Sequence, residues 1–172
     1  RLYSTTRPGG GLLAMALGAT SMSLLDQETL AAGVTLSAPA RLLQAQIGGR
    51  DVLLVSGRND PRLGGFALLP SGGIGDVVQI TGSPAGTVAA QALVGVGGTI
   101  YAYVNRMGES TILTYRMDSS GKMALADDLD APGAFQGVDV AAMQAIRLNG
   151  APYLLTLSTG QEALRSYRIE AD

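Results

Sequence analysis

The 172-residue sequence predicts an all-β fold built from repeated four-stranded antiparallel sheets. Three observations predict it: short apolar segments separated by turn residues, the same glycine-containing turn recurring about every 50 residues, and a total of 24 glycines. Repeats of this length with four short strands each are typical of β-propeller blades. A β-sandwich also has short strands at regular spacing, but nothing in that fold requires one turn to recur at this interval.

The recurring turn is found by aligning the sequence with itself. A shift of 49 residues places Gly48-Gly49 on Gly97-Gly98, and a shift of 52 residues places the latter pair on Asn149-Gly150. These dipeptides adopt the positive φ angles that tight two-residue hairpins demand. We therefore expect each of them to join the first two strands of a four-stranded unit.

The four strands of one unit are best defined between residues 40 and 84. They are short, rich in apolar and β-branched residues, and separated by glycine, proline and other turn residues. Residues 53–55 and 101–104 are apolar on both faces of their strands, which is expected when a sheet has neighbours on both sides. The expected strands of this unit are residues 42–47, 52–56, 63–69 and 77–80.

The whole chain, residues 1–172, is predicted to be a single domain. Pro39, Pro84 and Pro132 lie close to the expected junctions between units, where proline is suited because it cannot donate a hydrogen bond to a strand ladder. The quasi-repeats are expected near residues 1–39, 40–84, 85–137 and 138–172. In the first of them, the four strands are expected in order at residues 2–6, 12–17, 20–25 and 30–36.

The predicted strands number about fifteen, which corresponds to about three and a half to four blades. Two arrangements remain open. In a small closed ring, residues 2–6 would complete the last sheet, whereas in a partial ring this chain supplies about half of roughly seven blades. The partial ring is favoured because the repeats show no terminal capping. Its open faces would pack against the remaining blades of the same protein or a second copy, since folded proteins avoid exposed strand edges and apolar faces.

Two segments resemble a known family. Residues 114–123 and 166–170 are similar to the strand and turn of lactonase-type, phosphogluconolactonase-like seven-bladed β-propellers. In that family a Tyr-x-Ile/Val-Asp strand leads into a glycine-containing hairpin, and an apolar strand follows. The resemblance covers roughly residues 40–172 and is limited to the repeat.

Similar propeller domains also occur in large secreted bacterial proteins that carry calcium-binding nonapeptide repeats. The resemblance therefore implies a secreted or cell-surface protein. A cytoplasmic location stays open, because a chain without cysteine fits both compartments. No such nonapeptide occurs in this sequence.

The composition excludes several classes of function. There are no histidines and no cysteines, so the commonest general base, thiolate chemistry, Cys/His zinc sites and disulfides are excluded. With 12 basic and 14 acidic residues, the sequence predicts no nucleic-acid-binding surface. Residues 8–25 are uncharged but too rich in glycine and hydroxyl residues to span a membrane. An enzyme is not favoured, because the Arg, Asp and Glu residues form no recognisable catalytic constellation.

Two polar loops are candidate ligand-binding sites. Each follows the second strand of its unit, where loops can line one face of a propeller, and each combines arginine with an acidic residue. The alternative interpretation is a solvated turn, and the ligand, a small molecule or a sugar, is not identified. The candidate residues are Arg58, Asn59 and Asp60 in the first loop and Asn105, Arg106 and Glu109 in the second.

An acidic run is a candidate calcium site, because Ca²⁺ binds several carboxylate and carbonyl oxygens. The spacing of these residues does not match an EF-hand loop, so a solvated acidic surface without a cofactor is the alternative. The candidate ligands are Asp118, Asp127, Asp128 and Asp130.

The tyrosines at strand positions are expected to pack between neighbouring sheets. The alternative is a sugar-stacking platform, for which aromatic rings are also suited. These residues are Tyr101, Tyr103, Tyr115, Tyr153 and Tyr167.

The sequence favours a non-catalytic binding or assembly module built from propeller blades, as part of a larger secreted or surface bacterial protein. Its partners would be the remaining blades of the same protein or a second copy. The alternative is a lactonase-like hydrolase, which the family resemblance implies. Because the chain lacks histidine, the active site of such an enzyme would have to be completed by the remaining blades.

Overall fold

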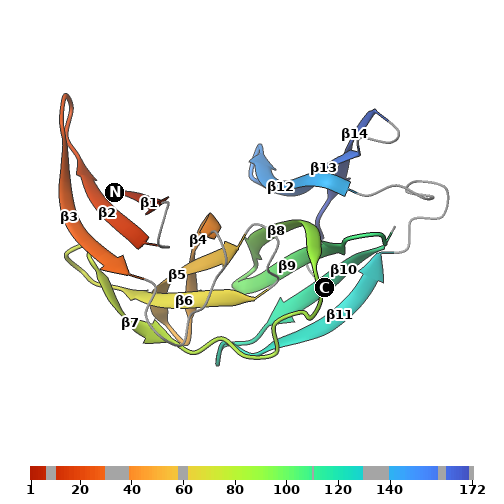
Figure 1. Ribbon diagram of the computed structural model, residues 1–172, viewed down its shortest axis with the longest axis horizontal. Coiled ribbons are helices and arrows are strands. Elements are labelled where there is room, and N and C mark those ends of the chain that lie inside the picture. Colours follow the sequence, from red (N-terminus) through yellow and green to blue (C-terminus); the bar gives the residue numbers. More distant parts are fainter. Residues whose placement is uncertain are drawn as a thin grey trace.

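The computed structural model describes residues 1–6, 11–29, 39–57, 62–109, 111–129, 140–158 and 162–170. Over these ranges the chain is all-β, with fourteen strands and no helix. The strands form four antiparallel sheets that follow one another in an arc and do not close into a ring (Figure 1). The predicted all-β fold of blade-like sheets is thus confirmed.

Each sheet draws its strands from one continuous stretch of the chain, and its strands are hydrogen-bonded in sequence order. Sheet 1 contains β1 (Leu2–Thr6), β2 (Gly11–Leu17) and β3 (Met22–Thr29). Sheet 2 contains β4 (Pro39–Ile47), β5 (Arg50–Gly57), β6 (Leu63–Leu68) and β7 (Ile74–Val78). Sheet 3 contains β8 (Val88–Val96), β9 (Thr99–Arg106), β10 (Ile112–Met117) and β11 (Met123–Leu129). Sheet 4 contains β12 (Val140–Leu148), β13 (Ala151–Ser158) and β14 (Ala163–Arg168).

The three predicted hairpins are present at the predicted dipeptides. Gly97 and Gly98 connect β8 to β9 with φ angles of 58° and 83°, and Gly48-Gly49 and Asn149-Gly150 also have positive φ at both positions. Positive φ at both central residues gives a turn whose twist matches that of the flanking strands. The same local geometry therefore starts sheets 2, 3 and 4.

The fourth strand of sheet 2 begins earlier than predicted. Residues 77–80 were expected, whereas β7 runs over Ile74–Val78. Ile74 is buried and pairs with Leu68 after a register irregularity in β6. Gly73 and Gly75 flank Ile74, and glycines at this spacing are typical of a turn, so the sequence around Ile74 does not indicate a strand. The start of β7 is determined instead by its pairing with β6.

Both faces of the central sheets are buried, as predicted from their continuous apolar runs. In β5, Val52 and Leu54 belong to the core between sheets 2 and 3, whereas Leu53 and Val55 belong to the core between sheets 1 and 2. This alternation follows from the two-residue period of a strand. The described residues therefore form three cores, one between each pair of neighbouring sheets.

The tyrosines of the strands contribute to these cores. Tyr101 and Tyr103 are buried between sheets 3 and 4, and Tyr115 is buried between sheets 2 and 3. Tyr167 is half-buried and packs against the core between sheets 3 and 4. The predicted packing role is confirmed for these four residues, and Tyr153 is half-buried on β13.

The described strands of sheet 1 lie close to their predicted places. The β2–β3 pair has a bulge after Ala14, and the pair formed by the third and fourth strands of sheet 3 has a bulge after Thr114. β1, β2 and β3 are nonetheless the first three strands of sheet 1 in sequence order, so the strands predicted at residues 2–6 and 12–17 are confirmed, and the third, predicted at residues 20–25, runs over Met22–Thr29. The strand expected at residues 30–36 lies outside the described residues. Pairing register depends on the neighbouring strand and cannot be read from the short segment alone.

The small closed ring is also wrong. β1 pairs with β2 in sheet 1, at the opposite end of the arc from sheet 4, so residues 2–6 do not complete the last sheet (Figure 1). Pro39 begins β4 and Pro84 lies between β7 and β8, whereas Pro132 lies outside the described residues.

Candidate functional site

The first predicted ligand loop cannot be placed, because Arg58, Asn59 and Asp60 lie outside the described residues. The second loop follows β9. Its Asn105 is fully buried, and its side-chain Nδ2 donates hydrogen bonds to the backbone oxygens of Glu109 at 2.8 Å and Thr111 at 3.0 Å. Its Oδ1 accepts a hydrogen bond from the backbone nitrogen of Val140 at 3.3 Å. Asn105 thus fixes the loop and ties sheet 3 to the first strand of sheet 4.

Arg106 and Glu109 lie together at the surface. Nη1 of Arg106 is 3.7 Å from Oε1 of Glu109. Both line a wide, open depression of about 540 Å³ together with Gly86 and Met107. The charges of Arg106 and Glu109 therefore partly neutralise each other, so the depression does not present an isolated charge to a ligand. Ligand binding by this loop stays a prediction.

The predicted calcium ligands are only partly described. Oδ1 of Asp118 accepts hydrogen bonds from the Ser120 backbone at 2.8 Å, the Ser120 hydroxyl at 2.6 Å and the Lys122 backbone at 3.0 Å. The hydrogen bond from the Ser120 hydroxyl and those from the two backbone amides lower the pKa of Asp118 below its ordinary value of 3.8. This carboxylate therefore holds the turn between β10 and β11.

The other acidic candidates leave the calcium prediction open. The backbones of Asp127 and Asp128 pair with Thr114 and Leu113, but their side chains are not described, and Asp130 lies outside the described residues. Among the side chains that the structure does describe, no three acidic residues gather in one place.

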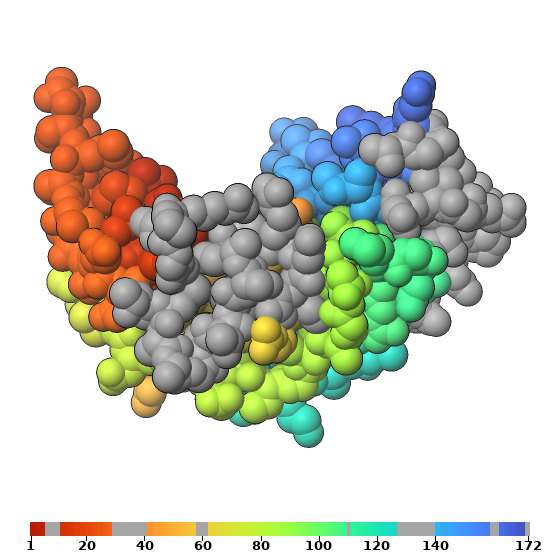
Figure 2. All heavy atoms as spheres, in the orientation of Figure 1, coloured from red at the N-terminus to blue at the C-terminus, as the bar shows by residue number. Residues whose placement is uncertain are grey.

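The outer faces of the two end sheets carry several exposed apolar side chains. Residues paired across neighbouring antiparallel strands lie on the same side of a sheet. The sheet 1 end face, which points away from sheet 2, consists of Leu2, Leu13, Met15, Leu17, Met22 and Leu24. The sheet 4 end face, which points away from sheet 3, includes Ile146, Leu148, Tyr153, Leu155, Leu157 and Leu164. Figure 2 shows the two end sheets standing apart at opposite ends of the molecule.

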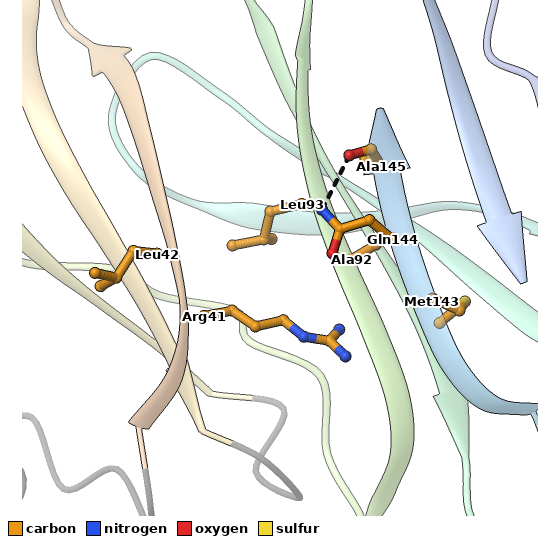
Figure 3. A pocket seen from close by; sticks show the side chains of 7 residues that line it. All are labelled: Arg41, Leu42, Ala92, Leu93, Met143, Gln144 and Ala145. Atoms are coloured by element: carbon orange, nitrogen blue, oxygen red, sulfur yellow. Dashed lines mark hydrogen bonds between the residues drawn. The ribbon is translucent and has the colours of Figure 1, made fainter. Parts of the chain in front are cut away.

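A smaller pocket lies where the first strands of sheets 2, 3 and 4 come together. It has a volume of about 230 Å³ and is lined by Arg41 and Leu42 of β4, Ala92 and Leu93 of β8, and Met143, Gln144 and Ala145 of β12. Figure 3 shows the Arg41 side chain extending from β4 towards β8, while Gln144 extends from β12 in the opposite direction. We call this the inner-strand pocket.

Arg41 was not among the residues singled out from the sequence. A signal was present, because the two repeat shifts align Arg41 with Ala90 and Ala90 with Ala142. The pairing register confirms this alignment, since the three residues face Ser56, Asn105 and Leu157, which are related by the same shifts. A charge thus replaces alanine at one repeat position.

No family model matches the chain, and no curated protein matches it. The four blade-like antiparallel sheets are compatible with a propeller, and no family is identified from them. None of the chain's described residues forms a helix long and apolar enough to cross a membrane.

Proposed function

We propose that this chain is a non-catalytic assembly module, whose two end sheets pack against further blade-like sheets to complete a ring. One observation carries the proposal: the two apolar end faces are equivalent, by strand register, to faces that are buried between sheets inside the arc. A secreted or surface location in a larger bacterial protein belongs to the same proposal and rests on the resemblance of the repeat.

The equivalence is clearest for sheet 4. Leu164 of β14 corresponds at the 52-residue shift to Ile112 of β10. Ile112 is 1% exposed in the core between sheets 3 and 4, whereas Leu164 is 70% exposed. The same shift relates Tyr153 to the buried Tyr101. The sheet 4 end face therefore has the composition of a face that receives another sheet.

Sheet 1 shows the reciprocal feature. Leu17 and Met22 form the pair next to the β2–β3 turn, as Met117 and Met123 do next to the β10–β11 turn. Met117 is 3% exposed against sheet 2, whereas Leu17 is 53% exposed. The two end faces are thus the two complementary halves of the contact that occurs three times inside the arc.

A second copy of the chain supplies both missing halves at once. Rotation about a two-fold axis would bring the sheet 1 end face of each copy against the sheet 4 end face of the other. The resulting ring would contain eight sheets, which lies within the usual range of about four to eight blades. Burying the two end faces would stabilise the dimer by about 25 cal/mol for each Å² of apolar surface removed from water.

The solution mass tests the proposal. We expect the purified chain to have twice its 17.6 kDa mass in size-exclusion chromatography with light scattering. Leu164→Asp should give a monomer, because association would bury an unpaired carboxylate. Leu125→Asp is the matched control: Leu125 is 57% exposed but lies on β11 of the internal sheet 3, so this variant should keep the wild-type mass. A wild-type chain that is strictly monomeric, with both variants behaving alike, would contradict the proposal.

The hydrolase alternative rests on the family resemblance alone. Lactone hydrolysis can be assayed with the chain by itself and again in the presence of the remaining blades. Activity only in the second assay would favour the hydrolase, whereas the assembly proposal expects no activity in either.

A further inference from the structure

The packing between sheets does not require an arginine in the inner-strand pocket. Arg41 shares a face of β4 with Leu43, Ala45 and Ile47, which pack against the core between sheets 2 and 3. At the equivalent positions of β8 and β12, Ala90 and Ala142 occupy the same place in the ladder. The contact between sheets 3 and 4 thus forms with a methyl group at this position, while Ala142 lies exposed on the outer side of sheet 4.

No described residue forms an ion pair with Arg41. Its side chain is half-buried, and its Nη1 atom is inaccessible to solvent without a hydrogen-bond partner within the described structure. Loss of hydration lowers the pKa of Arg41 below its ordinary value. Its ladder partner Ser56 is fully buried, and the Ser56 hydroxyl also lacks a partner among the described groups. Buried polar atoms are normally hydrogen-bonded, and of these two side chains only that of Arg41 belongs to a residue that lines the pocket.

The walls of the pocket define the chemistry of a ligand. Polar atoms make up the larger part of the lining surface, and the two polar side chains are the Arg41 guanidinium and the Gln144 amide, whose Nε2 already donates to the Ala145 backbone oxygen at 3.1 Å. A guanidinium pairs best with a planar oxyanion through two parallel hydrogen bonds. The volume of about 230 Å³ is small for a ligand site, and the Leu93 side chain, which extends from β8 towards β4 (Figure 3), can contact a short alkyl group.

We infer that the inner-strand pocket binds a short aliphatic monocarboxylate, with its carboxylate on Arg41 and its alkyl chain against Leu93. Inorganic phosphate has no alkyl part for these walls and carries more charge than one guanidinium can pair. The site lies between sheets of one chain, so the inference is independent of the assembly proposal.

Calorimetric titration of the 172-residue chain tests the inference with three probes: butyrate, inorganic phosphate and 1-butanol. We expect butyrate to bind, and phosphate and 1-butanol to bind at least tenfold more weakly. Phosphate binding without butyrate binding, or equal binding of butyrate and 1-butanol, would overturn the inference. This selectivity is measured on the wild-type protein and does not depend on any variant folding.

Variants test the role of Arg41. Arg41→Gln should weaken butyrate binding at least tenfold, and Arg41→Lys, which keeps the charge but loses the two-pronged geometry, should lie between. The matched control is Arg50→Gln, because Arg50 is exposed in the turn of the same hairpin and its loss changes the net charge equally. Butyrate should raise the melting temperature of the wild type and of Arg50→Gln, but not that of Arg41→Gln. Equal butyrate binding by Arg41→Gln and the wild type would refute the assignment.

Discussion

Single side chains in this fold connect elements that are distant in sequence. Asn105 was expected from its position in a polar loop to contact a ligand. The structure places it fully buried, with three hydrogen bonds to the backbones of its own loop and of β12. Its loop position was evident from the sequence. Its contacts with β12 were not, because they depend on how sheet 4 packs against sheet 3.

Asn105→Ala should therefore destabilise the protein. It leaves the Val140 amide and two backbone oxygens without their partner, and each buried unsatisfied group costs about 1–3 kcal/mol. Urea unfolding should show this loss. Gln46→Ala, which removes an exposed amide paired with Asp51, is the control and should change the free energy of unfolding by less than about 0.5 kcal/mol.

Asp118 makes the stability depend on pH in the acidic range. Its pKa is lowered in the folded state, so near its ordinary pKa of 3.8 the unfolded chain binds more protons than the folded one. The stabilisation by Asp118 is thus complete above that value and is lost as the pH falls through the lowered folded pKa. In urea unfolding, the stability difference between wild type and Asp118→Ala should be largest at neutral pH and should shrink below pH 3.8. A constant difference down to pH 2 would contradict this role.

Strands and turns could be predicted to different extents. The hairpin dipeptides and the strands with two apolar faces were predicted correctly, because both patterns are local. The start of β7 was not, because it depends on an irregularity in its pairing with β6. The inner-strand pocket was not predicted either, because its lining residues are as distant in sequence as Arg41 and Ala145 and come together only when three sheets pack side by side.

The hairpin turns should be sensitive to a methyl group even where space is available. Gly98 has a φ of 83° and no atom within 4 Å of an added Cβ, so Gly98→Ala should cost about 1 kcal/mol through backbone strain alone. Gly95 also has open space but no positive φ, and Gly95→Ala should be neutral or stabilising by up to about 1 kcal/mol. Because neither added methyl group meets a neighbouring atom, a difference between the melting temperatures of the two variants reports the backbone strain at positive φ alone.

The described sheets form an arc with three contacts between neighbouring sheets, and in the proposed assembly the two end sheets supply the two halves of a fourth contact. This arrangement predicts a directional association, in which the sheet 1 end face of one copy contacts the sheet 4 end face of another. Contacts between two sheet 1 end faces, or between two sheet 4 end faces, are not expected. Such head-to-tail contacts close into a ring only when the rotation between copies permits it.

Cross-linking of introduced cysteines tests this directional contact most directly, because the chain has no cysteine of its own. Leu17→Cys and Leu164→Cys variants are mixed and treated with a short bismaleimide, with Leu125→Cys replacing Leu17→Cys as the control. The account predicts a covalent pair of the first two variants, little product from either alone, and little from the control mixture. Equal products in all mixtures, or products only between identical variants, would contradict it.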